Sequence, residues 1–370
     1  HSLRRRQRQM CIRDRSMIMN HESLIATKAR RVRTVAPKDA LMEFGLRRAQ
    51  GHSAGLWGAR AAMIGGFNGT SNVEAGKRFG IPVLGTMAHS WVMSFDEEID
   101  AFREYVRQYH DNLILLADTY NVLEMGVPHA IQVFKELKEE GRLPGKYGIR
   151  IDSGDIAYLS QEATRMFTEA GFPDAIISGS NDLDEYTIQS LKAQGCTVTS
   201  WGVGTKIITA DGTSALGGVF KMAVKEADGK EVPVMKFSND VEKMTNPGIK
   251  TVYRFYKKDT GKMITDLVCL HDEKAADGGD FTLVTESAKW RRKELKAGTY
   301  TMEELLRPVV ENGRNLPLPA LPEIIRYADK QMDTLWPEYT RLLNPDLMEI
   351  NLSDKLQTLK SELIRRELGE

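Results

Sequence analysis

The sequence predicts an α/β fold, an incomplete or irregular (β/α) barrel followed by a smaller, partly missing α+β domain. From about residue 55, short apolar strands alternate with amphipathic helical patterns, at the spacing of strand–helix units. Polar clusters follow nearly every predicted strand. An open doubly wound sheet would instead concentrate its ligand at one switch point, so the barrel is favoured.

Six segments are predicted to be strands, at 81–84, 113–117, 147–151, 175–178, 197–201 and 218–224. An eightfold barrel needs more, so strands before residue 80 must contribute or closure must be incomplete. Helices are predicted after a capping box of Ser94 and Glu97, over 127–137 with a stop at Gly141, and over 156–167 with a stop at Gly171.

The pattern changes after residue 230. Segments 252–256 and 263–270 flank a turn at 258–261 and predict a hairpin. Helices are predicted over 322–336 and 354–368, the second capped by Ser353. The basic run 289–296 is interpreted as solvated surface.

Residues 1–15 contain six arginines and one aspartate and lack apolar periodicity. A transit peptide and a nucleic-acid-binding arm are alternatives, but a non-native lead is favoured. The predicted domains are therefore a non-native or disordered basic lead over 1–16 and a catalytic barrel over 17–230. A C-terminal α+β layer over 231–370 would pack on the barrel and complete the smaller domain.

Composition excludes several classes of protein. Apolar residues make up 41% and charged residues 28% of the chain, which is ordinary for a globular protein. No apolar run approaches the roughly eighteen residues that span a bilayer, and outside the lead the chain is mildly acidic, unlike nucleic-acid binders. Three cysteines without metal-type spacing favour a reducing cytoplasm.

The sharpest chemical cluster is Arg150, Asp152 and Asp155. Alternation along a strand puts Arg150 and Asp152 on one face, and the Ser153-Gly154 turn lets Asp155 begin a helix. A guanidinium beside two carboxylates suits a polyphosphate with magnesium. A structural salt bridge with an N-capping aspartate is an equal alternative.

Three further positions follow predicted strands or precede the barrel pattern. The backbone of Gly202-Val203-Gly204 with the Thr205 hydroxyl suits a terminal phosphate, although a tight turn explains these glycines as well. Phe44 with Arg47 and Arg48 could stack a flat ring and hold an anion, against a core phenylalanine with surface arginines. His89 lies in a small-residue loop, where an imidazole could serve as base or nucleophile.

Taken together, these segments closely resemble the nicotinate phosphoribosyltransferase family of type II phosphoribosyltransferases. The matching stretches include EFGLRRAQG (43–51), IGGFNGTSNVEAG (64–76), GIPVLGTMAHSWVMSFDEE (80–98), GIRIDSGDIAYLS (148–160), SNDLDEYTIQSL (180–191), WGVGTKIIT (201–209) and NPGIKTVYRFY (246–256). The resemblance implies transfer of phosphoribose from phosphoribosyl pyrophosphate to nicotinate, with coupled ATP hydrolysis, as the first step of NAD salvage from nicotinate.

The resemblance also implies roles for single residues. His89 would be transiently phosphorylated by ATP; Phe44 and Arg47 would bind the pyridine substrate. Asp118 would be a catalytic residue, as would Arg150 and Asp152. The segment with Arg150, Asp152 and Asp155 would bind pyrophosphate, ribose and Mg²⁺. Asp152 and Asp155 are the candidate metal ligands. The remaining contacts would come from Ser90, Asn181, Gly202, Gly204, Thr205 and Lys221, the last as a charge partner of the phosphate.

Ser71 bears on the choice of substrate. The related nicotinamide-using family carries aspartate in the segment matching 69–72, and a carboxylate would repel nicotinate, whereas a serine hydroxyl can donate to it. Nicotinate is therefore predicted. Family members carry a further N-terminal segment, so an inactive, truncated remnant is one alternative. A nicotinamide-specific relative is another. A barrel aldolase using Lys221 as a Schiff-base amine ranks low. The family also implies a cytoplasmic homodimer with a shared active site.

Overall fold

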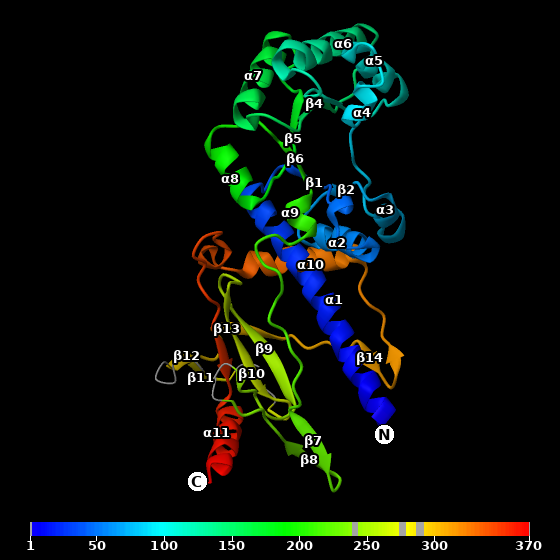
Figure 1. Ribbon diagram of the computed structural model, residues 1–370. Coiled ribbons are helices and arrows are strands. Elements are labelled where there is room, and N and C mark those ends of the chain that lie inside the picture. The colour runs from blue at the N-terminus through cyan, green and yellow to red at the C-terminus, as the bar shows by residue number, and fades with distance from the viewer. Residues whose placement is uncertain (1, 239–242, 274–278, 286–291, 370) are drawn as a thin grey trace. The chain divides into compact units, whose positions relative to one another are not determined.

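The computed structural model describes residues 2–238, 243–273, 279–285 and 292–369. The chain forms two compact units, His1–Gly217 and Gly218–Glu370 (Figure 1). The boundary thus falls thirteen residues before the predicted end of the barrel at 230. That the second unit packs on the first and completes a smaller domain stays a prediction.

The first unit is built around a six-stranded parallel sheet. Its strands are β1 (Ala40–Glu43), β2 (Gly69–Thr70), β3 (Leu113–Leu116), β4 (Tyr147–Ile151), β5 (Ile176–Gly179) and β6 (Ser200–Val203). The order across the sheet is β2-β1-β6-β5-β4-β3, and every pairing is parallel. The order runs from one edge strand to another, which confirms an incomplete (β/α) barrel.

Helices precede, connect and follow the strands of the first unit. They are α1 (Ser2–Val35), α2 (His52–Ile64), α3 (Val73–Phe79), α4 (His89–Val92), α5 (Glu98–Gln108), α6 (Val127–Glu139), α7 (Ile156–Glu169), α8 (Glu185–Ala193) and α9 (Thr205–Ile208), with short turns η1 (Leu46–Arg48) and η2 (Val122–Gly126). Strand β3 is buried on both faces, with the adjacent Leu115 and Leu116 at most 1% exposed, and Ile149 of β4 is 0% exposed, as expected for a parallel sheet covered by helices.

Most of the predicted elements of this unit are present. The strands at 113–117 and 147–151 become β3 and β4, and the helices at 127 and 156 become α6 and α7. Gly141 and Gly171 follow those two helices with φ of 67° and 88°, the left-handed conformation that glycine adopts without a steric penalty.

Three local predictions are wrong. Residues 81–84 form only one isolated bridge, from Val83 to Thr70, since Pro82 has no N–H to donate. Ser94 does not cap a helix: its hydroxyl donates to the carbonyl of Trp91 at 2.7 Å, and α5 starts at Glu98. No strand covers 218–224; β7 begins at Val224.

The predicted lead, 1–16, continues into α1 without a break. From Ile25 onward the helix has a buried face, with Ile25, Ala29 and Val32 at most 1% exposed. Whether residues 1–16 belong to the native protein stays a prediction.

The second unit contains a mostly antiparallel six-stranded sheet, in the order β12-β11-β16-β10-β9-β13. The strands are β9 (Lys250–Lys257), β10 (Met263–Leu270), β11 (Phe281–Thr285), β12 (Arg292–Leu295), β13 (Tyr300–Glu304) and β16 (Ile350–Leu352). The β9–β10 pair is the predicted hairpin. Phe255, Leu267, Leu283, Leu295 and Tyr300 form the core.

Smaller elements complete this unit. Two hairpins pair β7 (Val224–Ala227) with β8 (Lys230–Pro233) and β14 (Val310–Glu311) with β15 (Arg314–Asn315). The predicted helices are α10 (Leu321–Thr334) and α11 (Asp354–Leu368), and the Ser353 side chain caps α11 by accepting from Leu356 N. Of the basic run, 289–291 lie outside the described residues, and Arg292 and Lys293 are exposed.

Candidate active site

Polar side chains gather where the parallel strands of the first unit end. Phe44 follows β1, Asp118 follows β3, Asp152 follows β4 and Ser180 follows β5. The carboxyl ends of parallel strands meet at one edge, which is where barrel enzymes carry their active sites. The sheet therefore brings residues from distant parts of the chain to one place.

Arg150 is at the centre of this cluster. Its side chain donates through Nε to Ser180 Oγ at 2.7 Å, through one terminal nitrogen to Thr86 Oγ1 at 2.9 Å, and through the other to Asp152 Oδ1 at 3.0 Å. Asp152 Oδ1 also accepts from Ser180 Oγ. These contacts fix the plane of the guanidinium, which suits bidentate binding of phosphate oxygens.

Asp118 orders the loop that follows β4. Its side chain is 1% exposed, and Oδ2 accepts hydrogen bonds from Asp152 N at 2.9 Å and Ser153 Oγ at 2.6 Å. Its other oxygen, Oδ1, is buried and has no hydrogen-bond partner among the described residues. A buried carboxylate oxygen without a hydrogen-bond partner is costly.

His89, the first residue of α4, faces the same carboxylates. Its Nδ1 lies 3.2 Å from Thr119 Oγ1, and its Nε2 lies 4.0 Å from Asp118 Oδ1 and 3.9 Å from Asp152 Oδ2. The side chain is 42% exposed. The imidazole is thus held on one side, faces two carboxylates and remains accessible to a substrate.

Phe44 joins the cluster through Arg150. The guanidinium carbon of Arg150 lies 5.5 Å from the centroid of the Phe44 ring, within cation–π range. Gly202 lies against this ring, because a Cβ at Gly202 would come within 2.5 Å of ring carbon Cε2. The glycine of the GVG segment therefore makes room for an aromatic ring, which the sequence pattern did not reveal.

The other predicted residues are less tightly connected. Ser71 donates to the carbonyl of Glu43 at 3.4 Å, and Asp155 caps α7 by accepting from Tyr158 N at 3.1 Å. Asn181 is exposed and adopts φ of 115°, an unusual conformation for a residue other than glycine. Gly204 and Thr205 open α9, and Arg47 and Ser90 are exposed.

Lys221 falls in the second unit and is exposed, so its place relative to this cluster is not defined. Asp155, exposed at the start of α7, has none of the contacts that join Arg150 to Asp152. Across the described ranges, no group of three His, Cys, Asp or Glu side chains is arranged to hold a metal ion.

Sequence reasoning missed several residues that hold the site together. The hydroxyls of Thr86 and Ser180 accept hydrogen bonds from Arg150, and the hydroxyl of Thr119 contacts His89. Thr119 and Ser180 each adjoin a predicted site residue, Asp118 and Asn181, which is the one signal that could have found them. Glu43, fully buried at the end of β1, also escaped notice. Burial raises the pKa of its carboxyl, although hydrogen bonds from Thr70 and Gly45 act in the opposite direction.

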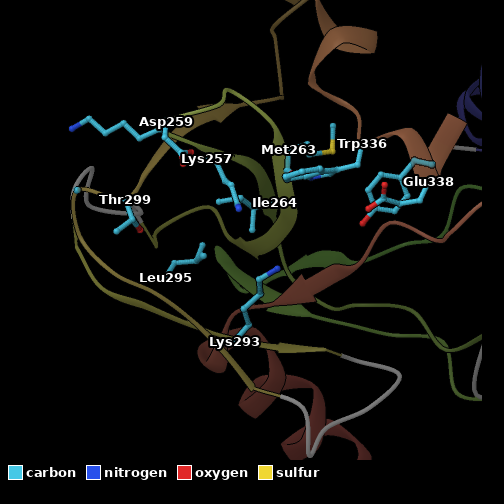
Figure 2. Close-up of a pocket in the computed structure, with 12 residues that line it drawn as sticks. Lys257, Asp259, Met263, Ile264, Lys293, Leu295, Thr299, Trp336 and Glu338 are labelled. Carbon is cyan, nitrogen blue, oxygen red and sulfur yellow. The ribbon is translucent and has the colours of Figure 1, made fainter.

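A separate cavity of about 730 Å³ lies within the second unit. Lys257, Met263, Lys293 and Trp336 are among its lining residues (Figure 2). No predicted site residue lines this cavity. Its lining residues all belong to the second unit, and the convergent polar cluster of the first unit better meets the chemical criteria for an active site.

The fold is that of an α/β barrel-type enzyme, and the cluster at the carboxyl edge of its sheet is the candidate active site. The model of the nicotinate phosphoribosyltransferase (NAPRTase) family matches residues 40–274, and that of the nicotinate phosphoribosyltransferase C-terminal domain matches 249–360. The chain belongs to the nicotinate phosphoribosyltransferase family.

Curated relatives and solved structures agree with this assignment. The chain is 41% identical to nicotinate phosphoribosyltransferase of Bacillus subtilis over 351 residues, covering 94% of this chain and 70% of the relative. The human enzyme of that name is 31% identical over 401 residues, covering 94% and 73%.

The crystal structure of human nicotinic acid phosphoribosyltransferase superposes with a TM-score of 0.79 at 30% identity, covering 93% of this chain and 74% of that one. Nicotinate-nucleotide pyrophosphorylase from Pyrococcus furiosus, at 22% identity and a TM-score of 0.63, covers 85% of this chain and 71% of its own. This second likeness concerns the fold alone.

Proposed function

We propose that this chain transfers phosphoribose from phosphoribosyl pyrophosphate to nicotinate, forming nicotinate mononucleotide and pyrophosphate with coupled hydrolysis of ATP. The observation that carries the proposal is the convergence of His89, Asp118, Arg150 and Asp152 at one edge of the sheet, in a chain that belongs to this family. The reaction would be the first step of NAD salvage from nicotinate.

The chemistry requires charge to be managed at two points. The pyridine nitrogen forms a bond to the anomeric carbon of the sugar, and pyrophosphate leaves with the electrons of the broken carbon–oxygen bond. The sugar becomes cationic in the transition state, so the carboxylates of Asp118 and Asp152 stabilise it, and the guanidinium of Arg150 holds the anionic leaving group.

The pyridine substrate would bind beside Phe44. The Phe44 ring would stack on it, Arg47 would contact its carboxylate, and the Ser71 hydroxyl would donate a hydrogen bond to the same group. Ser71 and Phe44 lie on adjacent loops, because β2 pairs with β1. This arrangement supports nicotinate as the acceptor.

The phosphoribosyl end would bind further along the same edge. Ser90 and Asn181 would contact the ribose and pyrophosphate. Gly202, Gly204 and Thr205, around the end of β6, would hold the 5′-phosphate, with Lys221 as a charge partner.

His89 would accept the γ-phosphoryl group of ATP. With its proton on Nδ1, the ring donates to Thr119 Oγ1 and leaves the Nε2 lone pair free to attack phosphorus. The nitrogen–phosphorus bond forms, the bond to the bridging oxygen breaks and ADP departs with its electrons. Phosphorylation would add a dianion to the site, so the phosphorylated and unphosphorylated forms would bind the substrates with different affinities. Through this difference, ATP hydrolysis would bias the reaction toward product.

Magnesium fits the donor chemistry of the site. Asp152 and Asp155 supply carboxylate oxygens, the ligands that Mg²⁺ prefers, and Mg²⁺ commonly takes only one or two protein carboxylates together with substrate phosphates. When bound, Mg²⁺ would neutralise charge on the pyrophosphate.

The family supports two further inferences, a homodimer with a shared active site and a cytoplasmic location. The three cysteines are free, in keeping with a reducing compartment. Within the part of the chain that the structure describes, no helix has the length and apolar character required of a membrane span.

Labelling with γ-³²P-ATP tests the proposal. Incubation should give acid-labile phosphate on His89, and addition of nicotinate with phosphoribosyl pyrophosphate should give labelled phosphate release and nicotinate mononucleotide. His89→Asn should abolish the label while His129→Asn keeps it. Label on another residue, or none on the wild-type chain, would contradict the phosphohistidine mechanism, and absence of the mononucleotide would contradict the transferase activity.

A further inference from the structure

Glu43 is a buried carboxyl that the proposed chemistry does not use. It is the last residue of β1 and is 0% exposed. Its Oε1 accepts from Gly45 N at 2.5 Å and its Oε2 accepts from Thr70 Oγ1 at 2.6 Å. Among the described residues it forms these two bonds and no ion pair. Burying a carboxyl without a cation is costly, so its presence calls for a reason.

The two hydrogen bonds reach two different loops. Gly45 belongs to the loop after β1, between Phe44 and the turn that carries Arg47. Thr70 ends β2, and its hydroxyl also accepts from Asn72 N at 3.0 Å. One carboxyl thus ties together the start of both loops.

Backbone contacts strengthen the connection. Ser71 N donates to the carbonyl of Glu43 at 2.9 Å. The loop at Gly45 is packed tightly, since a Cβ there would lie 2.8 Å from Glu43 Oε1 and 2.5 Å from Ile208 Cβ. Phe44 and Ser71 are therefore both positioned by residues that contact Glu43.

We propose that Glu43 is a positioning residue that sets the separation between Phe44 and Ser71, and through it the recognition of the pyridine substrate. This inference rests on the proposed function, which assigns the pyridine end to those two residues. Glu43 itself touches no substrate in this scheme, because it is buried beneath the loops.

A purely structural role makes a different prediction. Loss of packing alone would lower the melting temperature and change all kinetic constants together. A positioning role changes the KM for nicotinate more than the KM for phosphoribosyl pyrophosphate. The proposed pyrophosphate contacts have other partners: Arg150 donates to Ser180 and Thr86. Asp152 donates through its backbone N–H to Asp118 and accepts from Ser180, and neither residue is bonded to Glu43 in the part of the chain that the structure describes.

Three variants of the whole 370-residue chain separate these roles. Thr70→Val removes the bridging hydroxyl with little change in shape, and Glu43→Leu removes both hydrogen bonds. Each should raise the KM for nicotinate roughly tenfold or more, leave the KM for phosphoribosyl pyrophosphate within about threefold, and erode the preference for nicotinate over nicotinamide. Glu43→Gln should stay within about threefold of wild type, because its amide can accept from Gly45 N and donate to Thr70 Oγ1.

Glu185→Gln is the matched control. Glu185 is an equally buried carboxyl of the same unit, at 1% exposure, but it pairs with Lys28 and Arg31 of α1 and should lower the melting temperature without changing the ratio of the two KM values. If Glu43→Leu does not fold, Thr70→Val carries the test. An unchanged KM ratio in a folded Thr70→Val variant would overturn the inference alone, whereas wild-type protein without nicotinate turnover would overturn the proposed function and this inference with it.

Discussion

Arg150 lies in β4 and Asp152 directly follows it, and because the two are two positions apart, the alternation of the strand puts both side chains on the same face. The distance of 3.0 Å between a terminal nitrogen of Arg150 and Asp152 Oδ1 confirms the structural ion pair that the sequence left open, and the ligand site stays a prediction. The pair is partly exposed, at 18% for Arg150 and 27% for Asp152. A partly exposed pair that also faces an imidazole remains available to a charged substrate.

Ser71 provides the residue-scale test of substrate choice. Its side chain is half-buried and only weakly engaged, at 3.4 Å from the carbonyl of Glu43, so it can donate to a bound carboxylate. Ser71→Asp should reduce kcat/KM for nicotinate roughly tenfold or more, a change of about 1.4 kcal/mol, because two carboxylates would then repel each other, and should favour nicotinamide. Competition between the two substrates measures the effect.

Ser71→Asn controls for size in this experiment, since it is close in volume to aspartate and uncharged. It should weaken nicotinate less than the aspartate variant does. Equal selectivity in Ser71→Asp and wild type would show that this position does not read the acceptor group.

The predicted convergence of residues from distant loops is present. His89, Asp118, Arg150 and Asp152 lie close together, because parallel strands bring their carboxyl ends to one edge, while the roles of these residues stay predictions. The hydroxyls of Thr86 and Ser180 could not be predicted to contact Arg150, because serine and threonine are common in loops and their partners depend on three-dimensional packing. No sequence pattern predicted the burial of Glu43, because the segment around it was not predicted as a particular strand.

At the scale of elements, apolar runs with clear boundaries were predicted well. β3, β4, α6 and α7 have strong apolar patterns and glycine or turn residues at their ends. The short strands β1 and β2 were anticipated only as unspecified strands before residue 80. β1 has four residues and β2 has two, which are too few to show the alternation of apolar and polar residues that marks a strand. The pairing of both strands depends on neighbours far away in the chain.

Helices α1 and α8 are joined by ion pairs. Glu185 of α8 is 1% exposed and lies 2.9 Å from Lys28 Nζ and 2.7 Å from Arg31 Nε, both on α1. Lys28 is itself buried, at 8% exposure. Removing the carboxylate would leave a buried ammonium without its counter-charge, which is strongly destabilising.

Glu185→Gln should therefore lower the free energy of unfolding by about 3 kcal/mol, measured by urea denaturation. The comparison is Glu136→Gln, which breaks an equally short but exposed pair with Arg103 and should cost less than about 1 kcal/mol. Equal losses in the two variants would indicate that burial does not determine the contribution of the α1–α8 pair.

At the scale of the whole molecule, the chain contains two units with separate cores. Phe134 packs against Tyr147, Phe167 and Phe172 in the first unit, and Phe255 packs against Phe281 and Tyr300 in the second. The two phenylalanines are both 0% exposed. The candidate active site belongs to the first unit, apart from Lys221, so its architecture depends chiefly on the first core.

Exchange of amide hydrogens after core truncation tests whether these units unfold separately. Phe255→Ala should cost about 3–5 kcal/mol through lost burial and a cavity, and should raise exchange in β9, β10 and β13 while β3 to β6 keep their protection. Phe134→Ala, the matched truncation in the first unit, should do the reverse and should also impair labelling of His89, because β3 and β4 carry Asp118 and Arg150. If either substitution raised exchange equally in both sheets, the chain would unfold as one cooperative body, and the separation into two independently stable units would be wrong.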